Sequence, residues 1–478
     1  MNQCLAKHTL KSMLFAFTAI TLSGCVTAPD LGDPRAPRAD LAFNQSCSIA
    51  AIPDWWTIYK DPQLDALVKQ GLAKSPTMDQ AAASIQKADA YATQVGAATL
   101  PSVTADVSLQ KYKQSYNMGI PASAVPHGFQ DLGSAGLTFS YQFDFWGRNK
   151  GILNAALSER EAAQLEAEQV KIIISTSIAA AYVQLAQLYS ELDEAKDSVT
   201  VRFKTANLFE KRHKNGLENE GGVKQAIANH ASAEAEVAAI EERINLICNQ
   251  LVALVGASPE QAKSIKRPKL SNIRPFGDVS SLPADLIARR PDINSAKLKL
   301  EAAATYINVA RTGFYPNINF AATAGQQSLG LNTFTRSGSF TSTIGPAIHL
   351  PIFMMKNLES AYQEAYANYN AAVAAYESTI IQALHEVADA LTSQKSLAIR
   401  LDKTKKAMYA AEQAYTVINN RYKGGLATYL EVLRAEDTLI LARRATTDIE
   451  SRVFTLDVAL VKSMGGGFQP AQQSKEHA

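Results

Sequence analysis

The sequence predicts an α+β membrane protein that combines a long α-helical coiled-coil barrel with strands of a transmembrane β-barrel. Three observations lead to this prediction: an N-terminal export signal, a pattern that occurs twice along the chain, and, in each copy, a change from alternating to helical periodicity. Alternation with a period of two indicates half-buried strands, whereas apolar residues three and four apart indicate helices. The 478 residues suffice for several domains.

The overall charge of the chain is close to neutral. Lys and Arg number 47 against 45 Asp and Glu, which leaves a formal charge of +2, and no basic run stands out. Because phosphate binding needs clustered positive charge, nucleic acid is not an expected partner. The hydrophobic fraction of 47 % is ordinary and argues against a disordered chain or a polytopic helical membrane protein.

Residues 1–24 are predicted to be a signal peptide. A basic start precedes an apolar stretch that is too short to span a bilayer, and small residues then lead to Cys25. The sequence LSGC is similar to the bacterial lipobox, so Cys25 is the expected site of a covalent lipid, and residues 25–60 form a lipidated extension. Val26 after the cysteine favours the outer membrane over the inner one. A plain secretory signal with a chance cysteine is the alternative.

The cysteines other than Cys25 do not suggest a metal or cofactor site. Cys4 belongs to the signal, and Cys47 and Cys248 remain. Without a CxxC pair or ligand-like spacing, no metal site is expected, and no cofactor other than the lipid. A disulfide between Cys47 and Cys248 stays open, because the compartment outside the inner membrane is oxidising.

The most informative feature is an internal duplication. LVKQGLAKSPTM (67–78) matches LPADLIARRPDI (282–293) at a spacing of 215, and SIAAAY (177–182) matches EVADAL (386–391) at a spacing of 209. The chain after the extension therefore divides into a first structural repeat (61–256), a linker (257–280), a second structural repeat (281–467) and a C-terminal tail (468–478).

Each repeat is expected to contain two amphipathic strands. Residues 103–110 and 137–144 alternate strictly, and a Gly- and Pro-rich loop is expected over 117–136. The second repeat shows a weaker alternation, in which Pro346 interrupts the last strand. Its expected faces are Ile318, Phe320, Ala322 and Ala324 on one strand, and Phe340, Ser342, Ile344, Ile348 and Leu350 on the other. Such strands fit a membrane barrel with a wet lumen, although a half-buried soluble sheet alternates in the same way.

Long helices follow the strands. Residues 147–213 and 356–423 lack proline, and each segment would form a rod of roughly 100 Å. After a Gly-containing turn, a return helix of about 40 residues runs back in each repeat, ending at Gly256 and at MGGGF (464–468). Shorter helices are expected near 76–99 and 291–313.

The long helices are expected to pack as coiled coils. The spacing of Ile240, Ile244, Ile247 and Leu251 fits an apolar stripe. The uncharged stretch 172–189 could suggest a membrane helix, but its Ser, Thr and Gln content favours a packed interior face.

Four strands cannot close a membrane barrel, since unpaired edges cannot be left in lipid and known barrels need about eight strands or more. Several copies must therefore share one barrel, and three chains would supply twelve strands.

The chain resembles a TolC-like outer-membrane factor, in the lipoprotein branch that serves RND-type tripartite efflux systems. The resemblance covers nearly the whole mature chain and is carried by these motifs: DWWTIYKDPQLDALV (54–68), FDFWGR (143–148), LIARRPDI (286–293), FYPNI (314–318), EVADAL (386–391), RYKGGLATYLEVL (421–433) and GGGF (465–468). It implies a homotrimer in the outer membrane of a Gram-negative bacterium, lipid-anchored and extending into the periplasm, which meets a periplasmic adaptor and an inner-membrane pump.

One segment departs from this family. Many relatives carry FDGGR after the fourth strand, where this chain has FMMKN (353–357). Glycines there would ease a sharp strand-to-helix join, so the local geometry stays open. Met354 and Met355 are expected to pack, because adjacent residues do not share a face as a copper path would need.

The two hairpin turns, RHKNG (212–216) and RYKGG (421–425), are predicted to reverse the chain through Gly216 and Gly425 in the left-handed conformation. By resemblance, the second turn and the helix after it close the periplasmic entrance of the tunnel.

Four residues near the second turn form the candidate periplasmic gate. Leu430 falls where relatives place a constricting apolar ring, Tyr422 and Glu431 where some make closing contacts and an acidic ring, and Arg434 where an acidic residue is usual. The entrance is therefore expected to be less cation-selective than those of relatives, with Glu431 and Arg434 alternating as charge pairs. The alternative is that these are ordinary solvated residues at a helix start.

The expected function is that of an outer-membrane channel component of a tripartite efflux pump, which gives small toxic compounds an exit duct from the periplasm. The alternatives are the exit duct of a type I protein secretion system, a structural envelope lipoprotein and the periplasmic adaptor itself. An enzyme is not expected, because GxSxG, HExxH and P-loop motifs are absent and the seven His are scattered.

Overall fold

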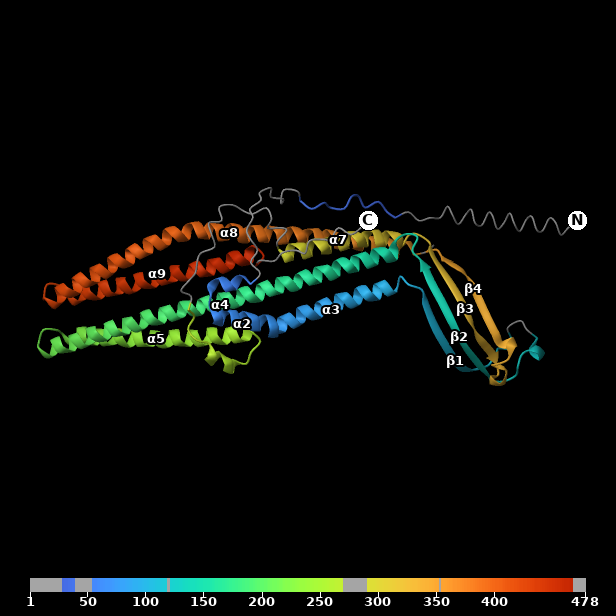
Figure 1. Ribbon diagram of the computed structural model, residues 1–478, viewed down its shortest axis with the longest axis horizontal. Helices are drawn as coiled ribbons and strands as arrows, with labels where there is room; N and C mark the ends of the chain where they lie inside the picture. Colours follow the sequence, from blue (N-terminus) through green and yellow to red (C-terminus); the bar gives the residue numbers. More distant parts are fainter. Residues whose placement is uncertain (1–27, 39–53, 118–120, 270–289, 352–353, 467–478) are drawn as a thin grey trace. The chain divides into compact units, whose positions relative to one another are not determined.

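A computed structural model describes residues 28–38, 54–117, 121–269, 290–351 and 354–466. They form two compact units, and both halves of the chain contribute to each unit (Figure 1). The first unit joins Gln86–Ala162 and Ala296–Ala375 with the chain before Pro37, and the second joins Arg38–Ile85, Ala163–Ser295 and the chain after Tyr376. The predicted signal peptide, Cys25, Cys47 and the C-terminal tail lie outside the described residues.

One antiparallel sheet of four strands, in the order β1-β2-β3-β4, belongs to the first unit (Figure 1). The strands are β1 (Ser102–Tyr112), β2 (Gln130–Phe143), β3 (Asn317–Leu329) and β4 (Phe340–His349). The first repeat supplies β1 and β2, and the second supplies β3 and β4. The predicted four strands per chain are therefore confirmed.

The register of the sheet places the predicted apolar residues on one face. Val103 lies opposite Phe139, which lies opposite Ala322, and Ala322 lies opposite Ile344. Many side chains of this face are uncovered, including Val107, which is 81 % exposed. An apolar face of this extent, left open to its surroundings, is typical of a sheet that meets lipid or another chain.

The opposite face carries hydroxyl groups that pair across the strands. Ser102 and Ser140 are joined by a hydrogen bond of 2.8 Å, Ser108 and Ser134 by another of 2.8 Å. Thr323 and Thr343 are 2.6 Å apart in the same relation. Cross-strand pairs of this kind stabilise a sheet and give this face an affinity for water.

Two expectations for the strands were wrong. The loop expected over 117–136 ends early, because β2 already begins at Gln130. Gly133 and Ser134 enter the strand because β1 pairs with them, and Gly133 leaves room for Phe334, which would lie 3.2 Å from an added Cβ. Pro346 does not interrupt β4, which runs from Phe340 to His349 with Pro346 opposite Phe320 of β3.

The helices agree with the predicted segments. The long helices are α4 (Arg148–Lys214) and α8 (Met355–Lys423), and the return helices are α5 (Glu220–Leu254) and α9 (Tyr429–Ser463). The two shorter predicted helices are α3 (Pro76–Ala97) and α7 (Pro291–Thr312), and a further helix, α2 (Pro62–Lys74), was not predicted. The return helices have 35 residues each, slightly fewer than expected.

The largest core of the second unit forms along α4 and α5. The predicted stripe residues Ile240, Ile244, Ile247 and Leu251 are all buried in it, together with Ile178 and Tyr182 of α4. By length and composition α4 could cross a membrane, but most of its apolar window is buried. The stretch 172–189 is therefore the packed interior face that its composition predicted. Cys248 is buried in the same core as a free thiol.

The motif with two tryptophans anchors the chain to this core. Trp55, Trp56 and Tyr59 form a short 3₁₀ helix, η2 (Trp55–Tyr59), and all three are buried. The Tyr59 hydroxyl donates a hydrogen bond of 2.6 Å to Asp457 of α9, and Trp55 donates one to Ser175 of α4. The motif thus joins the first repeat to the last helix of the second.

The ARRPDI motif fixes the start of α7. Arg290 is buried, and its guanidinium donates to Asp292 at 2.7 Å, to Glu386 of α8 at 2.7 Å and to the backbone oxygen of Ser463 at 3.1 Å. A buried charge is costly unless it is paired and hydrogen-bonded, and Arg290 meets both conditions. The start of α7, the end of α9 and the middle of α8 are therefore tied to one side chain.

The two strand-to-helix joins differ in their backbone. In the first repeat Gly147 takes a φ of 74°, in the left-handed region, just before α4. In the second, Met354 just before α8 has no positive φ, and neither have Met355 to Asn357, the first residues of α8. Met354 and Met355 are 49 % and 38 % exposed in the single chain, and their packing stays a prediction. A smooth helix start leaves both side chains on the surface.

Candidate functional site

The turns at the tips of the two helical hairpins have the same backbone. Leu217 N–H donates to Arg212 O at 2.8 Å, and Leu426 N–H donates to Arg421 O at 2.8 Å. Gly216 and Gly425, with φ of 70° and 75°, complete a Schellman motif in each turn. The predicted left-handed conformation of both glycines is confirmed.

The helices after the two turns begin with different caps. In the first hairpin the Asn219 side chain accepts a hydrogen bond of 2.8 Å from the Gly222 N–H. In the second, Thr428 and Glu431 form a capping box, in which the Glu431 carboxylate accepts from the Thr428 N–H at 3.2 Å. Glu431 therefore stabilises the start of α9 in addition to any role at an entrance.

Tyr422 joins the two hairpins at their tips. It is 3 % exposed and stacks with Phe209 of α4 at 6.0 Å between ring centroids, while the Arg212 guanidinium lies 4.8 Å from its ring. Burial raises the pKa of Tyr422, so its hydroxyl stays protonated. The residues that meet here, called the tip cluster, are Ala206, Phe209, Val223, Ala226, Tyr422 and Val432.

The other three predicted gate residues lie apart from Tyr422. Leu430, Glu431 and Arg434 are exposed on the first turns of α9, and Leu430 is 55 % exposed. Among the described residues, Glu431 and Arg434 form no ion pair with each other. The structure therefore separates the four into one buried contact between hairpins and three exposed side chains, of which Glu431 also caps α9.

A polar contact that was not predicted lies between α4 and α9, behind the tip cluster. Glu436 of α9 is 2 % exposed, with one carboxylate oxygen 3.6 Å from Arg202 Nε and the other 3.5 Å from the Thr205 hydroxyl. Arg202 also donates to Asp437 at 2.9 Å. Burial raises the pKa of Glu436, an effect that Arg202 opposes.

The sequence did hold a signal for this contact. Val432, Ala435, Glu436 and Leu439 are all buried on α9, so a carboxylate stands within the apolar stripe of a helix. A second carboxylate, Glu194 of α4, accepts a hydrogen bond from Thr447 further along the same two helices. These residues define the α4–α9 seam.

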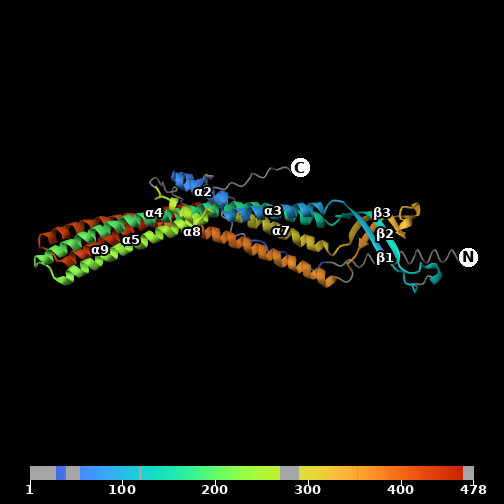
Figure 2. The ribbon, with the colours of Figure 1, turned by 90° about the horizontal axis from the view of Figure 1, so that it is seen from below.

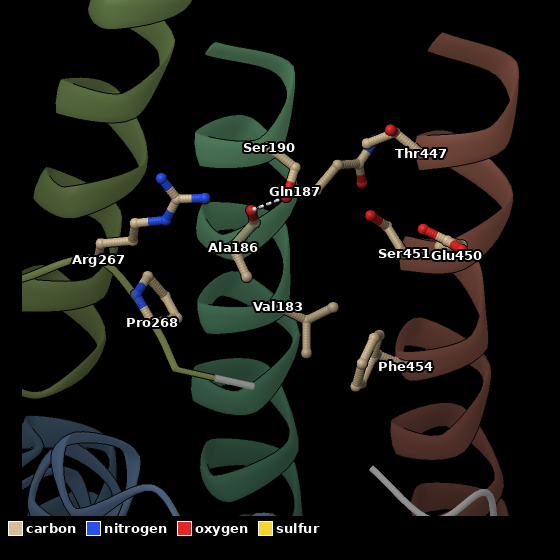
Figure 3. A pocket seen from close by; sticks show the side chains of 10 residues that line it. All are labelled: Val183, Ala186, Gln187, Ser190, Arg267, Pro268, Thr447, Glu450, Ser451 and Phe454. Atoms are coloured by element: carbon tan, nitrogen blue, oxygen red, sulfur yellow. Dashed lines mark hydrogen bonds between the residues drawn. The ribbon is translucent and has the colours of Figure 1, made fainter. Parts of the chain in front are cut away.

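A cavity of about 260 Å³ opens beside this seam, between α4, α9 and the segment at Arg267 (Figure 3). Its charged groups already have partners: Arg267 pairs with Asp193 at 2.6 Å, and Glu450 with Lys405 at 2.9 Å. Nor do the described residues contain a group of three or more His, Cys, Asp or Glu that could hold a metal ion. The charged side chains Arg267 and Glu450 of this cavity are thus engaged in ion pairs within the chain.

The two hairpins lie side by side in the second unit (Figures 1 and 2), and the first unit carries a sheet with one apolar and one hydroxyl-lined face. Together these features define an outer-membrane channel protein. The model of the family "Outer membrane efflux protein" matches residues 67–257 and 282–466, and the chain belongs to this family.

Individual relatives agree with this assignment. The chain is 33 % identical over 362 residues to the fusaric acid resistance protein FusA of Burkholderia cepacia, covering 73 % of this chain and 67 % of that protein. It is 26 % identical to the pyoverdine export outer membrane protein OpmQ of Pseudomonas aeruginosa, over 97 % of this chain and 98 % of that one. The crystal structure of the outer membrane protein VceC of Vibrio cholerae is 42 % identical, with a TM-score of 0.83 over 88 % of this chain and all of VceC.

The protein is thus an outer-membrane component of an efflux system, as the sequence predicted. Its family is one of transport proteins. Neither the lipid on Cys25 nor the gate is addressed by these similarities.

Proposed function

We propose that three copies of this chain close one twelve-stranded barrel and form a conduit through the outer membrane. The observation that carries this proposal is the four-stranded sheet, whose apolar face is exposed and whose outer strands β1 and β4 each have one unpaired edge within the chain. In lipid such edges must be paired, and pairing β4 of one copy with β1 of the next satisfies both. Twelve strands follow from three copies.

The gate of the conduit is assigned to the second hairpin tip. Leu430 leaves an apolar side chain uncovered on the first turn of α9, and three-fold repetition would gather three of them. Glu431 and Arg434 are exposed on the same helix start, and in the trimer they pair with those of neighbouring copies. Tyr422 acts differently, because it is buried and holds the second tip against the first.

A lipid on Cys25 fits the position of the residues that follow it. Ala28 and Leu31 pack against a cluster of Phe314 and Tyr362, and Phe314 precedes β3 by only a few residues. Ala28 and Leu31 thus bring the chain that follows the proposed lipid site beside the residues that lead into β3. The anchor and the strands would then enter the same membrane.

The partners of this conduit are a periplasmic adaptor and an inner-membrane pump of the RND type, as the resemblance to tripartite systems implies. Small toxic organic compounds are the proposed cargo. Relatives named for fusaric acid resistance and pyoverdine export support a small-molecule cargo.

The test is planar-bilayer conductance of the purified protein beside a Leu430→Ala variant. The wild type should conduct weakly, and the variant several-fold more, because a smaller side chain widens an apolar constriction. Leu217→Ala is the matched control, since Leu217 is exposed in the other hairpin turn and should leave the conductance unchanged.

The outcomes separate the parts of the proposal. Equal conductance of the wild type and Leu430→Ala would overturn the gate and leave the conduit. A folded trimer that does not conduct in any form would overturn the conduit itself.

A further inference from the structure

Apart from His349 at the end of β4, the hydroxyl-lined face of the sheet carries a single acidic or basic side chain. All four strands lie within the described residues, and along this face they present Ser, Thr, Asn, Gln, Gly, Ala, Leu and Tyr, with His349 at the end of β4. Asp106 on β1 is the exception. On the apolar face, by contrast, Lys111 and Asp131 pair with each other at 3.2 Å.

The surroundings of Asp106 keep its carboxylate open to solvent. Across the sheet Asp106 lies opposite Gly136, which lies opposite Gly325, so its row has no side chain on the two neighbouring strands. A Cβ at Gly325 would come within 2.5 Å of Ala135 O, and the close approach of the two strands therefore excludes any larger residue there. Thr104 donates a hydrogen bond of 3.4 Å to the carboxylate.

No cation compensates this charge in the described part of the chain. Asp106 takes part in none of its ion pairs, and the basic residue nearest in sequence, Lys111, is engaged by Asp131 on the opposite face. A carboxylate that faces water without a partner acts on whatever ion or solute passes beside it.

We propose that Asp106 sets the charge preference of the barrel lumen, favouring cationic over anionic solutes at mid-strand. The inference rests on the proposed conduit, in which three Asp106 side chains would share one lumen. They form a sparse acidic ring at mid-strand, and among the described strand residues of this face no other Asp, Glu, Lys or Arg is present. This selectivity is separate from the hairpin tips, where Arg434 replaces the usual acid.

The expected size of the effect follows from Coulomb's law. A carboxylate two residues along the same face lies about 7 Å away, which in water changes the local concentration of a singly charged reagent about 1.5-fold at physiological salt and about 2.7-fold at low salt. The local concentration of a cationic reagent rises by this factor and that of an anionic reagent falls by the same factor. The ratio of their labelling rates therefore changes by the square of the factor.

The experiment places a reporter cysteine beside Asp106 in the full-length protein on intact cells. In Ser108→Cys, labelling rates are measured with a cationic and an anionic methanethiosulfonate reagent that differ in charge. Both reagents reach the strands through the outer mouth, so the result does not depend on the state of the hairpin tips. The parent protein gives the background from its own cysteines, of which Cys248 is buried.

The cationic reagent should react about fivefold faster than the anionic one, after correction for their rates with a free thiol. Adding Asp106→Asn should bring the corrected ratio close to one, whereas Asp131→Asn, a matched loss of an acid on the opposite face, should leave it unchanged. A ratio that Asp106→Asn does not alter would overturn the inference alone.

Val107→Cys tests the proposed conduit in the same experiment, because Val107 lies on the apolar face. Its reporter should react with neither reagent. Labelling of Val107→Cys without labelling of Ser108→Cys would mean that the faces are reversed, and it would overturn both the lumen and the role of Asp106.

Discussion

The two hairpin tips show how one backbone can serve two purposes. Both turns end a long helix with the same Schellman motif and a glycine of positive φ. At the spacing of 209, Val223 corresponds to Val432 and Ala226 to Ala435, and all four are buried. The shared positions are thus those that hold each hairpin together.

The tips differ where they meet their surroundings. Ile227 of the first hairpin is 41 % exposed, while its counterpart Glu436 is 2 % exposed against Arg202. Likewise Tyr422 is buried, whereas its counterpart His213 is exposed. Apolar residues are usually buried and carboxylates usually exposed, but here Ile227 is exposed and Glu436 is buried. This difference shows that each hairpin has its own set of neighbours.

The largest expected effect comes from removing the ring that joins the tips. Tyr422→Ala should lower the stability of the tip cluster by about 3 to 4 kcal/mol, because it deletes a buried aromatic side chain. Hydrogen exchange of the amides in the last turns of α8 and the first turns of α9 measures this loss. His213→Ala is the matched control and should cost no more than about 1 kcal/mol, for one exposed hydrogen bond. Equal effects would show that the tips are not distinguished in this way.

A smaller effect tests what the tips share. Gly216→Ala and Gly425→Ala should each cost about 1 to 2 kcal/mol, since an L-residue is strained at positive φ and neither added Cβ would meet another atom. Thermal unfolding followed by circular dichroism should give similar losses for both. Gly256→Ala should cost more, because its Cβ would lie 2.5 Å from Lys74 O. Different losses at the two turns would contradict their equivalence.

The smallest effect concerns Glu436, the buried carboxylate whose counterpart in the first hairpin is the exposed Ile227. Burial raises the pKa of Glu436 above its ordinary 4.5, so protonated Glu436 fits the seam better than the carboxylate does. Its contribution is complete below pH 4.5 and is lost as the pH rises through the raised pKa. Groups facing it are Arg202, Asp437, Tyr415 and Tyr429.

The rate at which trypsin cleaves α4 and α9 near the α4–α9 seam should depend on pH in the wild type. Glu436→Gln should remove part of that dependence. Asp437→Asn, at the exposed neighbour, should leave that dependence in place. If the wild type and Glu436→Gln responded to pH alike, the buried carboxylate would not be the titrating group.

Much of the fold could be predicted because its signals are local. Strict alternation placed β1, and the absence of proline placed α4 and α8 to within a residue or two. The start of β2 could not be predicted, since Gly133 and Ser134 are weak strand formers that enter the sheet only because β1 and β3 pair with them. Pro346 was misjudged for a similar reason, since β3 pairs with β4 on both sides of the proline.

The candidate site could be predicted only in part. The left-handed Gly216 and Gly425 follow from local backbone sterics, so the sequence sufficed. That Tyr422 lies between hairpins, while Leu430 stays exposed, depends on Phe209 and Arg212, more than 200 residues earlier in the chain. A pattern among neighbouring residues cannot indicate a contact between residues so far apart in the chain.

The sequence by itself determined the periodicities, the duplication and the glycines, because each depends on the sterics and hydrophobicity of neighbouring residues. Only the tertiary structure decided which face of α9 meets α4, and with it that Glu436 is buried and that Ile227 is not. It also decided that Asp106 stands alone beside Gly136 and Gly325, since register across strands is set by pairing between distant segments. Burial and charge compensation are properties of such neighbours, and they exist only once the chain has folded.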